Sequence, residues 1–223
     1  IAVNYWPQAL VYRPTHGWTT LSLPMAFYGA TISGINVLNQ ISGTVYDLQG
    51  PNHAVVWTSP DDLINLGTAT GFMDVKLHPN FATNGLIYLS YHKPARGEYG
   101  NNAIFRGRWN GKEIVEGKDI FVSDDVDALY SKMMFGADGK LYFTIGCPGV
   151  GTDDSIGRAQ KPDDYAGKTL RLNEDGTVPK DNPFVGKQGY NPEIFTMGHR
   201  VNLGLALNPW TNEFWVTEEG PQV

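Results

Sequence analysis

The side chains of this sequence that could do chemistry lie in short clusters. Residues 198–200 (Gly-His-Arg) place an imidazole beside a guanidinium, and residues 218–221 (Glu-Glu-Gly-Pro) follow a strand-like run. An imidazole can accept a proton near neutral pH, and a guanidinium is a planar donor to oxygen acceptors. His199 could line a pocket or serve packing, and both interpretations stay open. We expect His78, which precedes a proline at a strand end, to bond a turn.

The remaining acidic and thiol groups give weaker signals. Glu218 and Glu219 could form an acid/base pair, but consecutive strand residues point to opposite faces, so we expect no shared site. The acidic runs at 124–127 and 153–154 lack the alternating spacing of a calcium-binding EF-hand loop and are interpreted as solvated loops. Cys147 has no nearby histidine in the sequence to activate it, so we expect a buried small residue.

Composition excludes several classes of partner. The 223 residues carry a net charge of −6 and contain no basic run, so no nucleic-acid partner is expected. No apolar stretch approaches the roughly 18 residues of a membrane span, so no membrane partner is expected. A single cysteine excludes an internal disulfide framework and leaves the cellular compartment undecided.

A repeated hairpin pattern indicates the fold. Aromatic residues make up 12% of the chain, alongside 26 glycines and 14 prolines, which favours many short strands. Strand–turn–strand segments recur near residues 25–48, 74–91, 133–145 and 205–217. Their spacing, roughly 50 residues or more, is typical of four-stranded propeller blades. We predict an all-β chain, a single β-propeller domain over residues 1–223 that supplies about four blades.

Four blades do not close a propeller. An open ring would expose strand edges and apolar blade faces, which invite association. We therefore expect the remaining blades to come from a longer chain, from a second chain or from a second copy in a homodimer. The region around residues 146–165 is rich in Gly, Asp and Pro and predicts a loop, and no amphipathic helix is expected anywhere.

Four blocks of sequence, in order, resemble the soluble quinoprotein (PQQ-dependent) glucose/sorbosone dehydrogenases, which include the aldose sugar dehydrogenases. The blocks are residues 74–91 (DVKLHPNFATNGLIYLSY), 135–146 (FGADGKLYFTIG), 159–186 (AQKPDDYAGKTLRLNEDGTVPKDNPFVG) and 192–221 (PEIFTMGHRVNLGLALNPWTNEFWVTEEGP). The resemblance implies a six-bladed propeller. It also implies a small sugar or other carbohydrate as substrate, and a periplasmic or secreted location.

The resemblance further implies a reaction and its cofactors. In this family calcium anchors pyrroloquinoline quinone (PQQ), and a histidine takes a proton from the sugar while hydride passes to the quinone. By resemblance Arg200 contacts the quinone, Gln160 is a pocket residue, and His199 lies beside them. The main-chain carbonyls of Gly220 and Pro221 would bind the calcium, since hard cations prefer oxygen ligands.

Several family positions hold other residues here. Ala128 stands at the family histidine and cannot accept a proton; Asp127 is adjacent but would face the other way along a strand. Val201 replaces a cofactor-contacting asparagine, and a pocket glutamine falls at about Ala69. The family aspartate position holds Cys147 and a family histidine position holds Glu219.

Three functions therefore stay open. The chain could be a PQQ- and calcium-dependent sugar dehydrogenase with impaired or altered catalysis. It could be a non-catalytic propeller that binds carbohydrate or a protein partner. It could also be a calcium-assisted hydrolase or lyase that reuses the central pocket.

Overall fold

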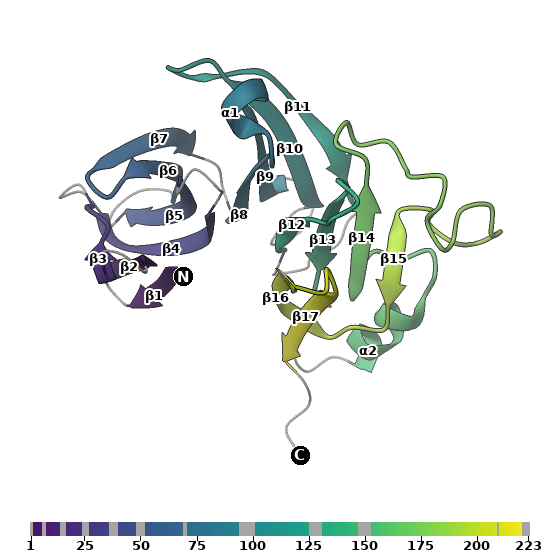
Figure 1. Cartoon of the computed structure of the whole chain (residues 1–223). Helices are drawn as coiled ribbons and strands as arrows, with labels where there is room; N and C mark the ends of the chain where they lie inside the picture. Colours follow the sequence, from purple (N-terminus) through teal and green to yellow (C-terminus); the bar gives the residue numbers. More distant parts are fainter. Residues whose placement is uncertain are drawn as a thin grey trace. The chain divides into compact units, whose positions relative to one another are not determined.

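The computed structural model describes most of the chain (Figure 1). The described residues are 2–5, 8–13, 17–23, 27–35, 40–47, 52–68, 71–93, 101–124, 131–146, 153–208 and 210–219. Within them, no helix is long and apolar enough to cross a membrane.

Short strands dominate the described chain, and consecutive strands are neighbours in each sheet. A three-stranded sheet contains β1 (Ala2–Tyr5), β2 (Gln8–Arg13) and β3 (Gly17–Thr20). Three four-stranded sheets and one two-stranded sheet follow. They comprise β4 (Phe27–Ile35), β5 (Ile41–Asp47), β6 (His53–Ser59) and β7 (Asp62–Thr68); β8 (Phe72–Leu77), β9 (Leu86–Lys93), β10 (Asn101–Trp109) and β11 (Ile114–Val122); β12 (Met133–Phe135), β13 (Leu141–Ile145), β14 (Lys168–Leu172) and β15 (Ile194–Met197); and β16 (Val201–Leu207) with β17 (Phe214–Glu219). The all-β class predicted from the sequence is confirmed.

Among the described residues, two helices interrupt the strands. The first, α1 (Phe81–Asn84), is a single turn between β8 and β9. The second, α2 (Asp153–Gln160), lies where the sequence predicted a loop, so the expectation of a helix-free 146–165 region was wrong. Gly and Ser are poor helix formers, and this eight-residue segment contains one of each, so its helical signal is weak.

The chain divides into two compact units. The first contains residues 1–91 and 106–118, and the second contains residues 92–105 and 119–223. The first unit has an apolar core in which Trp57 is fully buried and donates its indole N–H to the carbonyl of Ser22 at 3.0 Å. The other buried members of this core are Ala9, Val11, Leu21, Ala30, Ile41, Val45 and Val55.

His78, in the first unit, has the structural role predicted for it. The ring is buried, and its Nδ1 lies 3.0 Å from the backbone N of Asn80 and 2.8 Å from Nδ2 of Asn84. These contacts hold the turn between β8 and β9, which confirms the prediction that this histidine bonds a turn.

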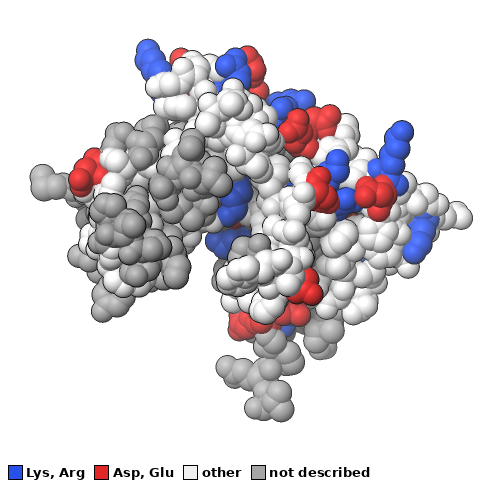
Figure 2. Space-filling model, in the orientation of Figure 1, with Lys and Arg blue, Asp and Glu red and all other residues white. Residues whose placement is uncertain are grey.

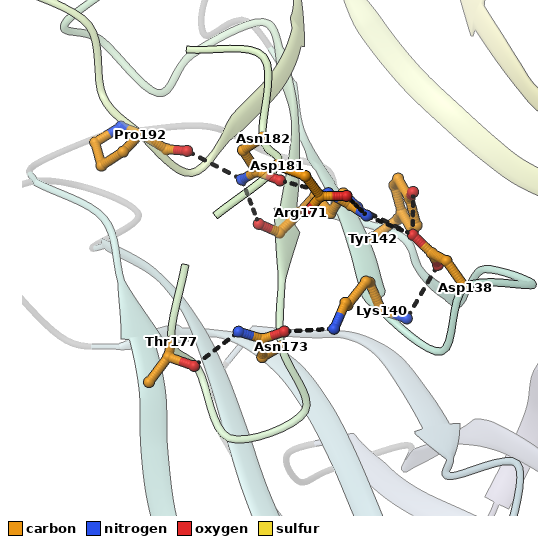
Figure 3. A network of polar contacts seen from close by, with 9 residues as sticks. All are labelled: Asp138, Lys140, Tyr142, Arg171, Asn173, Thr177, Asp181, Asn182 and Pro192. Atoms are coloured by element: carbon orange, nitrogen blue, oxygen red, sulfur yellow. Dashed lines mark hydrogen bonds and ion pairs between the residues drawn. The ribbon is translucent and has the colours of Figure 1, made fainter. Parts of the chain in front are cut away.

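Arg171 organises the second unit (Figure 3). Its guanidinium, 7% exposed, donates to Asp138 at 2.8 Å, to Asp181 at 2.9 Å and to Asn182 at 2.9 Å. Tyr142 donates its hydroxyl to the same Asp138 carboxylate at 2.9 Å. The network ties β14 to the β12–β13 turn and to the 181–182 loop. Each charge is paired, so we interpret the network as structural.

Candidate functional site

The loop at residues 198–200 joins β15 to β16 and carries two of the predicted cofactor contacts. The backbone N–H of Gly198 donates to the carbonyl of Ala159 at 3.0 Å, and that of His199 donates to the carbonyl of Gly167 at 3.1 Å. The loop is therefore bonded to the last turn of α2 and to the residue before β14. Figure 1 shows α2 beside the end of β15, where this loop begins.

Gln160 reaches the same loop from the end of α2. A Cβ atom placed on Gly198, which has φ +91, would lie 3.0 Å from Nε2 of Gln160. The amide therefore packs against the Gly198 backbone, and the positive φ of Gly198 is a conformation that favours glycine. The structure thus brings together the three residues that the sequence predicted as cofactor contacts, namely Gln160, His199 and Arg200.

The imidazole of His199 lies between two polar side chains. Its Nε2 is 2.7 Å from Oγ1 of Thr196, and its Nδ1 is 3.4 Å from Oε2 of Glu218. The same Glu218 oxygen accepts the backbone N–H of Arg200 at 3.1 Å. Glu218 thus fixes both the ring of His199 and the backbone that carries the guanidinium.

Sequence reasoning missed Thr196 and the role of Glu218. Glu218 comes from β17, and the pairing of Asn202 with Glu218 across the β16–β17 hairpin brings it near the loop. Directly opposite residues of an antiparallel pair share a face of the sheet. The register of the β16–β17 pair would have placed Glu218 beside the loop. That register could not be predicted by counting residues back from the turn, because a bulge shifts it between Asn202 and Gly204.

Asn202 is the most unusual polar residue of this region. Its side chain is fully buried, and neither Oδ1 nor Nδ2 has a hydrogen-bond partner. Leaving a buried amide unpaired costs about 1–3 kcal/mol. Such a group in a folded protein calls for an explanation, for example an ordered water or a ligand. The preceding Val201, which the resemblance places at the family asparagine position, is buried as well, at 6% exposure.

Carboxylates set the electrostatics around the hairpin. Figure 2 shows acidic side chains gathered over β16–β17, and Glu213, Glu218 and Glu219 are all exposed there. A surface of one sign attracts the opposite charge. This end of β17 therefore favours a cation, and Arg200, whose backbone N–H donates to Glu218, carries one such charge.

Several predicted positions lie outside the described residues. These are the base candidates Ala128 and Asp127, the calcium ligands Gly220 and Pro221, and the substituted positions Ala69 and Cys147. Their roles stay predictions. In the part of the chain that is described, no group of three or more His, Cys, Asp or Glu side chains could hold a metal ion.

Comparison with known proteins gives consistent matches. Residues 38–223 match the family described as Glucose / Sorbosone dehydrogenase. The chain is 33% identical over 158 residues to Aldose sugar dehydrogenase YliI of Escherichia coli, covering 68% of this chain and 41% of that protein. It is 28% identical over 190 residues to Quinoprotein glucose dehydrogenase B of Acinetobacter calcoaceticus, covering 74% of this chain and 39% of that protein.

Solved structures agree with these matches. A glucose dehydrogenase crystal structure is similar with a TM-score of 0.69 and 26% identity, over 86% of this chain and 60% of that one. The apo-form of the soluble aldose sugar dehydrogenase from Escherichia coli gives a TM-score of 0.65 and 28% identity, over 80% of this chain and 54% of that one. The β-propeller prediction is confirmed. The chain spans about 40% of the length of the two curated relatives described above.

Proposed function

Because the chain belongs to the glucose/sorbosone dehydrogenase family, we propose that it forms part of a PQQ- and calcium-dependent aldose dehydrogenase with altered catalysis. The observation that carries the proposal is the grouping of Gln160, His199 and Arg200 around the Gly198 backbone. When bound, PQQ would supply the electron acceptor for sugar oxidation. A periplasmic or secreted location, where calcium is available, belongs to the same proposal.

The side chains present fit such a cofactor chemically. A guanidinium and a carboxamide both donate hydrogen bonds, and a planar quinone with carboxylates presents many acceptors. Asn202 adds an amide with unmet hydrogen-bonding capacity in the strand that follows Arg200. Arg200 and Gln160 would donate to the cofactor, His199 would lie beside it and support the loop, and the carbonyls of Gly220 and Pro221 would hold calcium.

The chain's own residues would mainly orient the reactants. Glu218 accepts the Arg200 N–H and pairs with His199, so it would keep the loop in one conformation. Holding reacting groups in place lowers the entropic part of the barrier. Proton removal is the weak point, because Ala128 occupies the position of the family base and has no acceptor. Altered or impaired turnover follows from that substitution.

A binding experiment with matched variants tests the proposal. The 223-residue chain is titrated with PQQ in the presence of calcium, and the cofactor spectrum is followed for the native chain, Arg200→Gln and Arg108→Gln. Arg108 is an exposed arginine paired with Glu116 in the first unit, which makes it the control. We expect Arg200→Gln to weaken binding at least about tenfold, the worth of a charge-assisted hydrogen bond. Equal affinity in both variants would contradict the proposed role of Arg200.

Turnover is tested separately by dye-linked oxidation of glucose. We expect little or no oxidation by the native chain with bound PQQ, and a gain in rate for Ala128→His, because an imidazole restores an acceptor for the sugar proton. Binding of PQQ without any gain in Ala128→His would favour a non-catalytic binding protein. Calcium binding without PQQ binding would favour the hydrolase or lyase alternative.

A further inference from the structure

A buried lysine contacts the segments to which the 198–200 loop, called here the cofactor loop, is hydrogen-bonded. Lys168, the first residue of β14, is fully buried. Its ammonium donates to the carbonyls of Ala166 at 2.7 Å, Ala159 at 2.9 Å and Arg158 at 3.2 Å. An ammonium has three donors and is costly to bury without acceptors, so three carbonyl contacts account for its presence.

Two of these carbonyls belong to the last turn of α2. The last carbonyls of a helix have no partner within the helix, and that end carries a partial negative charge. Arg158 and Ala159 are in this turn, so the Lys168 ammonium completes the helix end and stabilises its dipole. Gln160, the last residue of α2, is thereby held in place.

The same atoms also hold the cofactor loop. The carbonyl of Ala159 accepts both the Lys168 ammonium and the N–H of Gly198. Gly167, the residue before Lys168, accepts the N–H of His199. A Cβ on Gly167, which has φ +65, would lie 2.3 Å from the carbonyl oxygen of His199. The end of α2, the start of β14 and the cofactor loop therefore meet at one point.

We infer that Lys168 is a positioning residue that sets the place of Gln160 and of the 198–200 loop. Its action passes through the carbonyl of Ala159, which would turn toward water or other donors without the ammonium. The consequence for cofactor binding rests on the proposed function. The consequence for the loop does not, because it follows from contacts within this chain.

The test compares Lys168→Met with Arg171→Met. Both variants remove a buried cation from β14, but Arg171 contacts Asp138, Asp181 and Asn182 and none of the loop. Amide hydrogen exchange is measured by NMR for Gly198 and His199, with the β13 amides as the internal reference and no ligand added. We expect Lys168→Met to speed exchange of the two loop amides by about tenfold relative to β13. The loss of the ammonium contact with the Ala159 carbonyl should make local opening of the loop easier.

Arg171→Met should leave the loop amides at the native ratio to β13. Equal effects of the two variants on this ratio would overturn the inference and make Lys168 a residue of general stability. Gly167→Ala provides a second route if Lys168→Met does not fold, because it disturbs the same junction without removing a charge. We expect faster exchange at His199 in Gly167→Ala, and unchanged exchange there would also overturn the inference.

Cofactor binding is then measured with PQQ and calcium for the same set. We expect Lys168→Met to weaken PQQ binding more than Arg171→Met. If the native chain does not take up PQQ, the proposed function fails while the exchange data still decide the role of Lys168. If PQQ binds the native chain and both variants equally, the loop position does not control the cofactor and that part of the inference is wrong.

Discussion

At the scale of single residues, both ring nitrogens of His199 have a partner, and one partner is a carboxylate. Thr196 is in β15 and Glu218 is in β17, so the imidazole joins two strands that flank the loop. A ring held in this way orients the neighbouring Arg200 through the shared Glu218 contact. We therefore regard the His199–Glu218 pair as support for the cofactor loop.

The contribution of Glu218 can be separated from that of its neighbour. We expect Glu218→Ala to lower the free energy of unfolding by about 1 kcal/mol, because the Arg200 N–H and the imidazole lose their acceptor. Glu219→Ala, one residue along the same exposed strand, should change it by less than about 0.5 kcal/mol. Urea denaturation of the two variants measures the difference, and equal effects would show that the Glu218 contacts add nothing.

Substitution of Asn202 should raise the stability of the chain, whereas substitution of Glu218 should lower it. Neither amide atom has a hydrogen-bond partner, so burying the amide costs free energy that no hydrogen bond offsets. Asn202→Leu removes that cost and should stabilise the chain without ligand by about 1 kcal/mol or more. The same variant should weaken PQQ binding if the amide serves the cofactor. Urea denaturation and PQQ titration measure the two effects. A clear loss of stability in Asn202→Leu would mean that the amide already has a partner such as a buried water.

Single residues also show where sequence reasoning stops. The resemblance predicts cofactor roles for Gln160, His199 and Arg200, and these roles stay predictions, while the contacts at Gly198 place the three residues around one loop. It could not supply Thr196, Glu218 or Lys168, since their roles depend on hydrogen bonds that are decided only when strands pair and the helix packs.

At the scale of secondary-structure elements, turn chemistry was the most informative signal. Asn110-Gly111 and Asp138-Gly139 are dipeptides that favour tight turns, and both glycines have positive φ, 98 and 72. The helix α2 was missed for the opposite reason. Lys168 and Asp164 stabilise its last turn, by contacts with the Arg158 carbonyl and the Arg158 guanidinium respectively, and both of these residues lie outside the helix.

Two aspartates, Asp138 and Asp164, make the stability of the second unit depend on pH. Burial raises the pKa of Asp138 and Asp164, but hydrogen bonds from Arg171 and Arg158 respectively, together with backbone N–H groups, outweigh it and hold each pKa below the ordinary value. A carboxyl with a lowered folded-state pKa stabilises the fold above its unfolded-state pKa of about 3.9. That stability is lost as the pH falls below about 4 and through the lowered folded-state pKa.

We therefore expect the second unit to lose stability from about pH 4 downward. Asp138→Asn and Asp164→Asn should be less stable at neutral pH and less sensitive to acid than the native chain. Urea midpoints measured between pH 7 and pH 2.5 would check this. An acid dependence unchanged in both variants would show that other carboxylates govern it.

At the scale of the whole molecule, the family relation accounts for the blade-like sheets and for the order of the sequence blocks. Ordered blocks in the sequence were enough to predict the propeller, because they contain strands of three sheets that follow one another along the chain: β8 and β9, then β13 to β15, then β16 and β17. The division into two compact units was not predicted, since compactness depends on contacts that the repeat pattern does not contain.

We propose that a cofactor site of this family persists here, with Ala128 at the position that the resemblance assigns to the base. Equilibrium titration of the native chain with PQQ, followed by the cofactor spectrum with calcium and with a calcium chelator, tests it most directly. We predict saturable PQQ binding that is lost on chelation, because calcium would anchor the cofactor. Absence of PQQ binding in the presence of calcium would contradict the account.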